Sequence, residues 1–151
     1  MKIPGLEIFG NKNKHEKPPF LYHGSTTAGI VELNPRERHK PNEEVGARVY
    51  ATQSPAWAAA HSWDWSSDEG IKLHIDKSGK VVLQVPAQFR ARMEVPVYLY
   101  KVPSVSFNLT SEEGSGSTYD SGENIVPVDV EKFNSVIEAV QHFGGEVILL
   151  E

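Results

Sequence analysis

A succession of short strand patterns, without regularly spaced helices between them, constrains the fold of this chain most strongly. In the clearest case Ile71, Leu73 and Ile75 alternate with polar residues before the turn-forming run Asp76–Gly79, and the alternation resumes over Val81–Val85. Alternation on both sides of a turn predicts a β-hairpin. Because parallel strands need long crossover connections, the pattern predicts an α+β fold with mainly antiparallel sheets.

The sequence also predicts further strands and two helices. Short strands are predicted at Phe20–His23, Arg48–Thr52, Val95–Val102, Glu123–Val128 and Val147–Leu150. A helix is predicted to begin at Pro55 after a cap at Ser54, because proline suits the first helical position. A second helix is predicted over Val130–Val140, with Asp129 as its cap and Gly144 as its end. The expected architecture is a split β-sandwich with a few short helices.

Size and composition indicate a single globular domain. The 151 residues suffice for one core. Residues 1–18, rich in Lys, Asn and Pro without periodicity, are assigned to an N-terminal extension, and residues 19–151 to the domain. The formal net charge of −5 disfavours non-specific nucleic-acid binding. Absence of cysteine excludes disulfides, cysteine-ligated metals and a cysteine nucleophile.

Common catalytic motifs are missing from the sequence. It contains no GxxxxGK[ST], no GxGxxG after a strand, no HExxH and no GxSxG. The six histidines lack close ligand spacing, so no metal site is predicted. No apolar run approaches the length of about 18 residues that suggests a membrane span, and the first residues lack the features of a secretory signal. We therefore expect a cytoplasmic protein with no membrane partner.

Two segments carry a more informative pattern. Tyr22-His23-Gly24-Ser25 lies at the first predicted strand, Val49-Tyr50-Ala51-Thr52 lies on the second, and His61 follows Tyr50 by eleven positions. Over about 40 residues this arrangement resembles the ADP-ribosyltransferase fold, in the branch of poly(ADP-ribose) polymerases and diphtheria-toxin-like enzymes. The C-terminal half agrees with that branch in the order of its elements.

The resemblance implies an NAD site on the first strand. His23 would hydrogen bond the adenine-side ribose of NAD. Gly24 would hold the nicotinamide amide through its backbone, because a glycine permits close approach to the main chain. Ser25 would line the same site near the nicotinamide ribose.

The second strand and the helix after it would complete that site. Tyr50 would stack on the nicotinamide ring, because an aromatic face suits a flat cationic heterocycle, and Thr52 would brace the strand end. His61 stands where the family most often has a second tyrosine. An imidazole offers less stacking area and titrates near neutral pH, so nicotinamide binding is expected to be weaker or pH-dependent.

The predicted catalytic carboxylate is Glu123, which follows a Gly/Ser-rich loop and begins a predicted strand, as the family's glutamate does. Cleavage of the nicotinamide–ribose bond develops positive charge on the sugar, which a carboxylate at the ribose 2′-hydroxyl stabilises in the transition state. Glu94 is the rival, without a flexible loop before it. The loop Thr110–Gly122, with Tyr119, would recognise the acceptor, and Ser121 argues against arginine as that acceptor.

The loop between the two matching strands holds a basic run, Arg36, Arg38 and Lys40. Two interpretations of this run stay open. It is either solvated surface or a contact to the phosphates of NAD, since a pyrophosphate favours a nearby cation.

The resemblance implies an NAD-dependent mono-ADP-ribosyltransferase, or an NAD glycohydrolase when water is the acceptor, with NAD as co-substrate. The acceptor would be an unknown macromolecule, protein rather than nucleic acid, and the small size suits a toxin or effector. Two alternatives stay open. One is an RNA 2′-phosphotransferase-like enzyme, whose Arg-His-Arg set has no match here. The other is a non-catalytic module that binds NAD, ADP-ribose or a protein. The sequence does not indicate an oligomeric state.

Overall fold

The computed structural model describes residues 17–35, 48–111 and 117–151. Within these ranges the strands are β1 (Phe20–Ser25), β2 (Val49–Thr52), β3 (Lys72–Ile75), β4 (Val81–Pro86), β5 (Val97–Pro103), β6 (Asn108–Ser111), β7 (Thr118–Ser121), β8 (Asp129–Phe133) and β9 (Glu146–Leu150). The helices are α2 (Pro55–Ala60), α3 (Arg90–Met93) and α4 (Val136–His142), with single 3₁₀ turns at Ser67–Glu69 and Ala87–Phe89.

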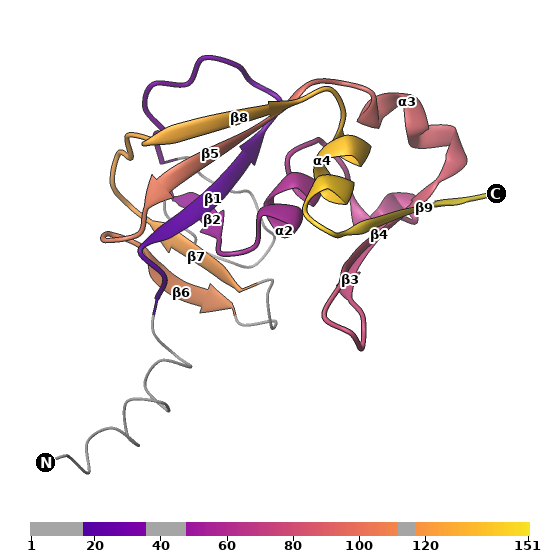
Figure 1. Cartoon of the computed structure of the whole chain (residues 1–151), viewed down its shortest axis with the longest axis horizontal. Coiled ribbons are helices and arrows are strands. Elements are labelled where there is room, and N and C mark those ends of the chain that lie inside the picture. The colour runs from indigo at the N-terminus through magenta and orange to yellow at the C-terminus, as the bar shows by residue number, and fades with distance from the viewer. Residues whose placement is uncertain (1–16, 36–47, 112–116) are drawn as a thin grey trace, which may run out of the picture.

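The strands form two sheets (Figure 1). The larger sheet has the order β6-β7-β2-β1-β5-β8, and its paired strands are antiparallel. The smaller sheet has the order β3-β4-β9, in which β9 runs parallel to β4. The predicted α+β class with mainly antiparallel sheets and a few short helices is therefore confirmed.

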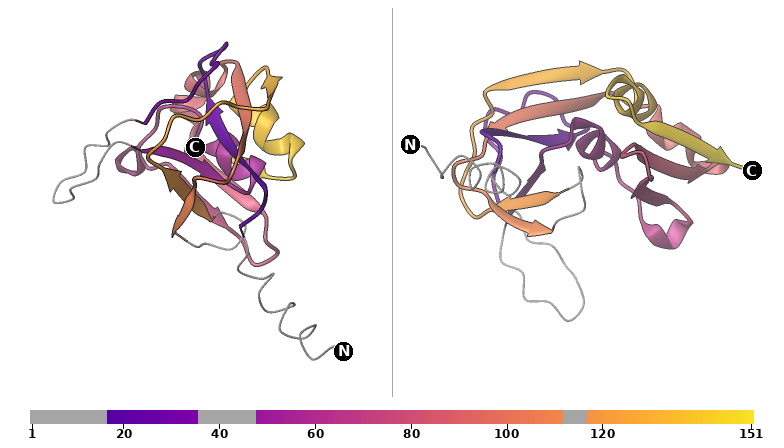
Figure 2. Two further views of the ribbon diagram at one scale, coloured as in Figure 1. Left: turned by 90° about the vertical axis from the view of Figure 1, so that its left-hand side faces the viewer. Right: turned by 60° about the horizontal axis from the view of Figure 1, so that its bottom comes forward.

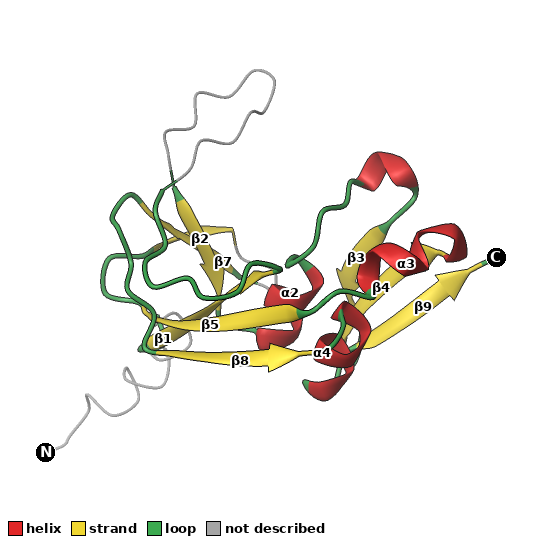
Figure 3. Ribbon diagram, turned by 90° about the horizontal axis from the view of Figure 1, so that it is seen from above, coloured by secondary structure: helices red, strands yellow, loops and turns green. Residues whose placement is uncertain are grey.

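Helices α2 and α4 lie at the junction of the two sheets (Figures 2 and 3). The core at this junction joins the alanines of α2 to apolar residues of β4, β5 and α4, with Leu83, Val97 and Val140 among the buried side chains. A second core covers the opposite face of the larger sheet and includes Leu21 and Val102. The larger sheet thus carries a core on each face, and α2 packs against one of them, although β8 is exposed over residues 129–132.

The start of α2 follows the sequence prediction closely. The Ser54 hydroxyl accepts a hydrogen bond from the Trp57 amide at 3.1 Å, and Pro55 occupies the first helical position. This cap satisfies one of the backbone N–H groups that a helix start leaves without an intrahelical partner. The predicted hairpin is also present as β3 and β4, and its turn is closed by Asp76 and Gly79. Local sequence is therefore sufficient to define these two elements.

The predicted second helix is wrong in its first half. Asp129–Phe133 is strand β8, which pairs with β5, and the helix α4 begins only after Ser135, whose hydroxyl accepts from the Glu138 amide at 3.0 Å. Pairing with an existing strand outweighs the local helical spacing of Val130 and Phe133. The predicted helix end at Gly144 agrees with its φ of +84°.

Two other predictions near the C-terminal half are also wrong. Glu123–Val128 is not a strand: within it Ile125 alone forms an isolated bridge, to Leu33. The predicted polar loop at 110–122 contains β7 and the last residues of β6, which pair with each other, while residues 112–116 lie outside the described residues. Pairing with β2 orders β7 although its sequence TYDS lacks an apolar alternation.

The end of the predicted N-terminal extension contacts the domain. Lys17 Nζ donates to the Phe107 carbonyl at 2.8 Å, and the Ser104 hydroxyl donates to the Pro18 carbonyl at 2.5 Å. Residues 1–16 of that extension lie outside the described part of the chain. Among the described helices, none has the length and apolar character needed to cross a bilayer.

Candidate functional site

Two adjoining pockets meet at His23 and Tyr50, which line both. The aromatic lobe, about 230 Å³, is lined by Tyr22, His23, Gly24, Tyr50, Ala51, Thr52, Trp57, Ala58, His61 and Thr118. The polar lobe, about 550 Å³, is lined by His23, Ser25, Thr27, Ala28, Gly29, Ile30, Glu32, Leu33, Asn34, Arg48, Val49 and Tyr50. Together the lobes have the size of a small-molecule site.

The aromatic lobe brings together five of the seven predicted site residues: His23, Gly24, Tyr50, Thr52 and His61. The sixth, Ser25, lines the polar lobe, where its hydroxyl accepts from the Thr27 amide at 3.0 Å. These residues come from β1, β2 and the end of α2, which are up to 38 positions apart in the chain. Their convergence follows from the pairing of β1 with β2 and the packing of α2 on β1.

Gly24 is required by the close packing of α2 on β1. A Cβ at this position would overlap the carbonyl oxygen of Ala58, and would lie 2.9 Å from the Ala58 carbonyl carbon and 3.0 Å from Ser62 Cβ. Two of these atoms belong to backbone, so no side-chain rotation relieves the clash. The glycine therefore sets the distance between β1 and α2, and with it the width of the aromatic lobe.

His23 links the two strands that carry the site. Its Nδ1 lies 2.7 Å from the carbonyl oxygen of Tyr50. A carbonyl oxygen only accepts hydrogen bonds, so Nδ1 carries the proton, and in the neutral ring Nε2 is then an acceptor. The bond fixes the imidazole between the two lobes.

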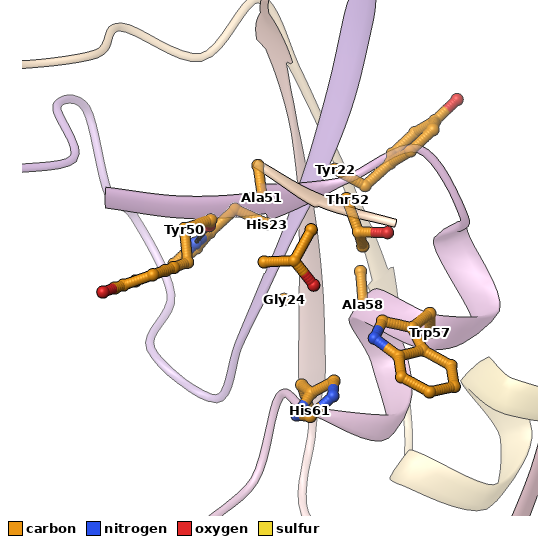
Figure 4. Close-up of a pocket in the computed structure, with 10 residues that line it drawn as sticks. Tyr22, His23, Gly24, Tyr50, Ala51, Thr52, Trp57, Ala58 and His61 are labelled. Carbon is orange, nitrogen blue, oxygen red and sulfur yellow. Dashed lines mark hydrogen bonds between the residues drawn. The ribbon is translucent and has the colours of Figure 1, made fainter. Parts of the chain in front are cut away.

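Three aromatic rings, those of Trp57, His61 and Trp65, lie next to one another at α2 and just after it, and form an aromatic wall. Figure 4 shows Trp57 and His61 on the α2 side of the pocket, across from Tyr50 and Thr52. The His61 ring lies 5.5 Å from Trp57 and stacks on Trp65 with centroids 5.8 Å apart and planes inclined by 26°. The Trp65 indole N–H donates to the Ala60 carbonyl at 2.9 Å. His61 is therefore held between two indoles with one side exposed.

Arg92 anchors the segment that carries Trp65. Its guanidinium donates to both carboxylate oxygens of Glu69, at 2.6 and 3.2 Å, and also to the Asp64 carbonyl. The hydrogen bonds from Arg92 hold the pKa of Glu69 below its usual range. Glu69 in turn accepts from the Ser66 amide in a capping box. Arg92 thus ties residues 64–69 to α3.

This arrangement predicts a pH-dependent contribution to stability. A lowered folded-state pKa means that Glu69 stabilises the fold above the pKa of its unfolded form, about 4.3, and loses that effect as the pH falls through the folded-state value. We expect Glu69→Gln to lower the melting temperature at pH 7. The difference from wild type should shrink as the pH falls below about 4. Thermal unfolding at both pH values measures this, and a difference that grows in acid would contradict the assignment.

The β2–β7 pair forms the floor of the aromatic lobe. Thr52 pairs with Thr118, and both line the lobe; the next pair toward the start of β2 on the same face is Tyr50 with Asp120. Opposed residues of an antiparallel pair project from the same face, with Cβ atoms about 4.5–5.5 Å apart. Asp120 is half-buried and makes no ion pair with any described residue. Asp120 therefore projects from the same face of the sheet as Tyr50, although it is not among the residues that line either lobe.

Glu123, the predicted catalytic carboxylate, lines neither lobe. It is exposed in the segment after β7, where its amide donates to the Ser121 hydroxyl at 3.1 Å. Ser121 itself is buried and bonded to Ser106, and Tyr119 belongs to the second core. Neither side chain is exposed to contact an acceptor. The rival Glu94 is exposed at the end of α3 and also lies outside both lobes.

Several lining residues were not expected from the sequence. Thr118 enters through strand pairing, which no local pattern indicates, and Trp57 is both buried and pocket-lining. Arg48 lines the polar lobe, whereas the predicted basic run at 36–40 lies outside the described residues. In the described part of the chain, no group of three or more His, Asp or Glu side chains is arranged to hold a metal ion.

Comparison with family models, curated proteins and solved structures gave no match to this chain. Its function is therefore inferred from the residues that form the site.

Proposed function

We propose that the two-lobed pocket binds NAD and that the chain is a mono-ADP-ribosyltransferase, or an NAD glycohydrolase when water is the acceptor. The observation that carries this proposal is the convergence of Gly24, Tyr50 and His61 on the aromatic lobe, with His23 between the lobes. These are residues on which the resemblance to the ADP-ribosyltransferase fold rests. The two mainly antiparallel sheets with short helices also agree with that resemblance at the level of fold class.

The aromatic lobe suits the nicotinamide end of NAD. Nicotinamide in NAD is a flat cation, which Tyr50 and the His61–Trp57 wall can contact through their faces. Gly24 lines the same lobe, and its backbone is the group that the resemblance assigns to the nicotinamide amide.

For the catalytic carboxylate we propose Asp120 in place of Glu123. When the nicotinamide–ribose bond breaks, its electron pair leaves with nicotinamide and positive charge develops at the ribose C1′. A carboxylate that binds the ribose 2′-hydroxyl stabilises this charge. Asp120 lies opposite Tyr50 on the face that forms the aromatic lobe. The acceptor then attacks C1′ and releases its proton, which yields ADP-ribose when water is the acceptor.

A non-catalytic NAD-binding module is the second candidate function. It is favoured by one observation: among the described residues, the aromatic lobe is lined by no carboxylate, and Thr118 occupies its floor. Such a module would bind intact NAD tightly and release no nicotinamide.

A binding titration tests the NAD site itself. Carba-NAD, whose carbocyclic sugar cannot form an oxocarbenium ion, separates binding from cleavage. We expect wild-type protein to bind it, Tyr50→Phe to bind it about equally, and Tyr50→Ala to bind it roughly tenfold more weakly because the ring contact is lost. Tyr98→Ala, on β5 outside both lobes, is the matched control. No binding by wild type, or equal binding by Tyr50→Ala, would contradict the proposal.

A further inference from the structure

We infer that Arg48 binds the pyrophosphate of NAD in the polar lobe; this inference rests on the proposed function and adds a ligand contact to it. Among the residues that the structure describes, Arg48 is the one lysine or arginine lining either lobe. The pyrophosphate of NAD carries two negative charges. The protein itself has a formal net charge of −5, so its overall field repels such a ligand. A local cation is therefore needed to favour it.

The guanidinium of Arg48 has a defined place in the fold. Arg48 directly precedes β2, and the register Val49↔Ser121 places Gly122 beside it on the neighbouring chain. A Cβ at Gly122 would lie 2.5 Å from Arg48 Nη1, so the absence of that side chain makes room for the guanidinium. Arg48 forms no ion pair with a described carboxylate. None of the described carboxylates therefore competes with a ligand for this charge.

The wall of the polar lobe opposite β2 is held in place by Tyr100. The buried Tyr100 hydroxyl donates to the Thr27 carbonyl at 2.6 Å and accepts from the Ile30 amide at 3.2 Å. Tyr100 also pairs with His23 in the β1–β5 register. These two hydrogen bonds hold the turn at residues 27–30 against β5, and the turn forms one wall of the polar lobe.

The charges of the polar lobe define where phosphates can lie. Glu32, the carboxylate in its lining, repels them, whereas the planar fork of Arg48 can donate two hydrogen bonds to phosphate oxygens. The two lobes meet at His23 and Tyr50. A ligand with its ring in the aromatic lobe and its anionic part near Arg48 therefore has to span both, as a dinucleotide does.

The test compares two ligands that differ in phosphate. Carba-NAD carries the pyrophosphate, whereas nicotinamide riboside has the ring and ribose without phosphate. Calorimetric titration of wild type, Arg48→Ala and Arg48→Lys with each ligand isolates the phosphate contact. Arg90→Ala, an exposed arginine on α3 outside both lobes, is the matched control. Melting temperatures establish that each variant is folded.

We expect Arg48→Ala to bind carba-NAD about 10- to 100-fold more weakly, the size of a lost charge-assisted contact, with nicotinamide riboside affinity unchanged. Arg48→Lys should fall between, because it keeps the charge without the fork. Equal carba-NAD affinity for wild type and Arg48→Ala would overturn this inference alone, as would equal losses for both ligands. Wild-type protein that binds neither ligand would overturn the proposed function, and this inference with it.

Discussion

Replacing Gly24 with alanine is expected to lower the melting temperature by roughly 3–10 °C and to abolish carba-NAD binding. The new Cβ would overlap the Ala58 carbonyl and approach Ser62 Cβ to 3.0 Å. Since α2 is also packed against α4 and the core behind it, the helix has no direction in which to yield freely. The clash must be relieved by moving β1 and α2 apart, which changes the aromatic lobe that they line.

Thr26→Ala is the control for this effect, because Thr26 is exposed just beyond the end of β1. It should melt and bind like wild type. A Gly24→Ala protein that matches Thr26→Ala in both measurements would show that α2 does not pack on β1 as described. A Gly24→Ala protein that melts at a lower temperature but binds carba-NAD with wild-type affinity would show that the spacing of β1 and α2 does not control ligand binding.

Asp120→Asn is expected to reduce the rate of nicotinamide release from NAD by roughly 100-fold or more, the scale of losing one electrostatic contact to a transition state. The amide keeps the size of the side chain and removes the charge that stabilises the ribosyl cation. Ground-state affinity should change little, because the carboxylate acts mainly on charge that develops as the bond breaks. Carba-NAD affinity within about threefold of wild type would therefore accompany the loss of rate.

Glu123→Gln is the matched variant, an isosteric change in an exposed carboxylate outside both lobes. We expect it to retain nicotinamide release within about threefold of wild type, the range left when no transition-state contact is lost. The reverse result, with Glu123→Gln inactive and Asp120→Asn active, would restore the carboxylate predicted from sequence. It would also contradict the assignment based on the β2–β7 register.

Much of the site is encoded in short segments that a sequence alone reveals. The strands at β1 and β2 and the capped start of α2 are local features, and they carry His23, Gly24, Tyr50 and His61. Once these elements pair, the residues share one lobe. Their spacing in the chain is therefore informative about their proximity in space.

Other parts of the site depend on pairing between distant segments. Thr118 lines the aromatic lobe, and Asp120 shares its face of the sheet, because β7 pairs with β2 in one register; a shift by one residue would turn both away. The TYDS sequence of β7 has no pattern that specifies this register. Asp129–Phe133 likewise has helical spacing and becomes a strand because β5 offers a partner edge. Arg92 and Glu69 meet only after both of their segments pack.

The most direct test of the central claim is release of free nicotinamide when the purified wild-type chain is incubated with NAD. The account predicts release, with ADP-ribose as the other product when no acceptor is present, and its loss in Asp120→Asn. Intact NAD after hours, in a protein that binds carba-NAD through Tyr50, would contradict the claim of cleavage and indicate a binding module.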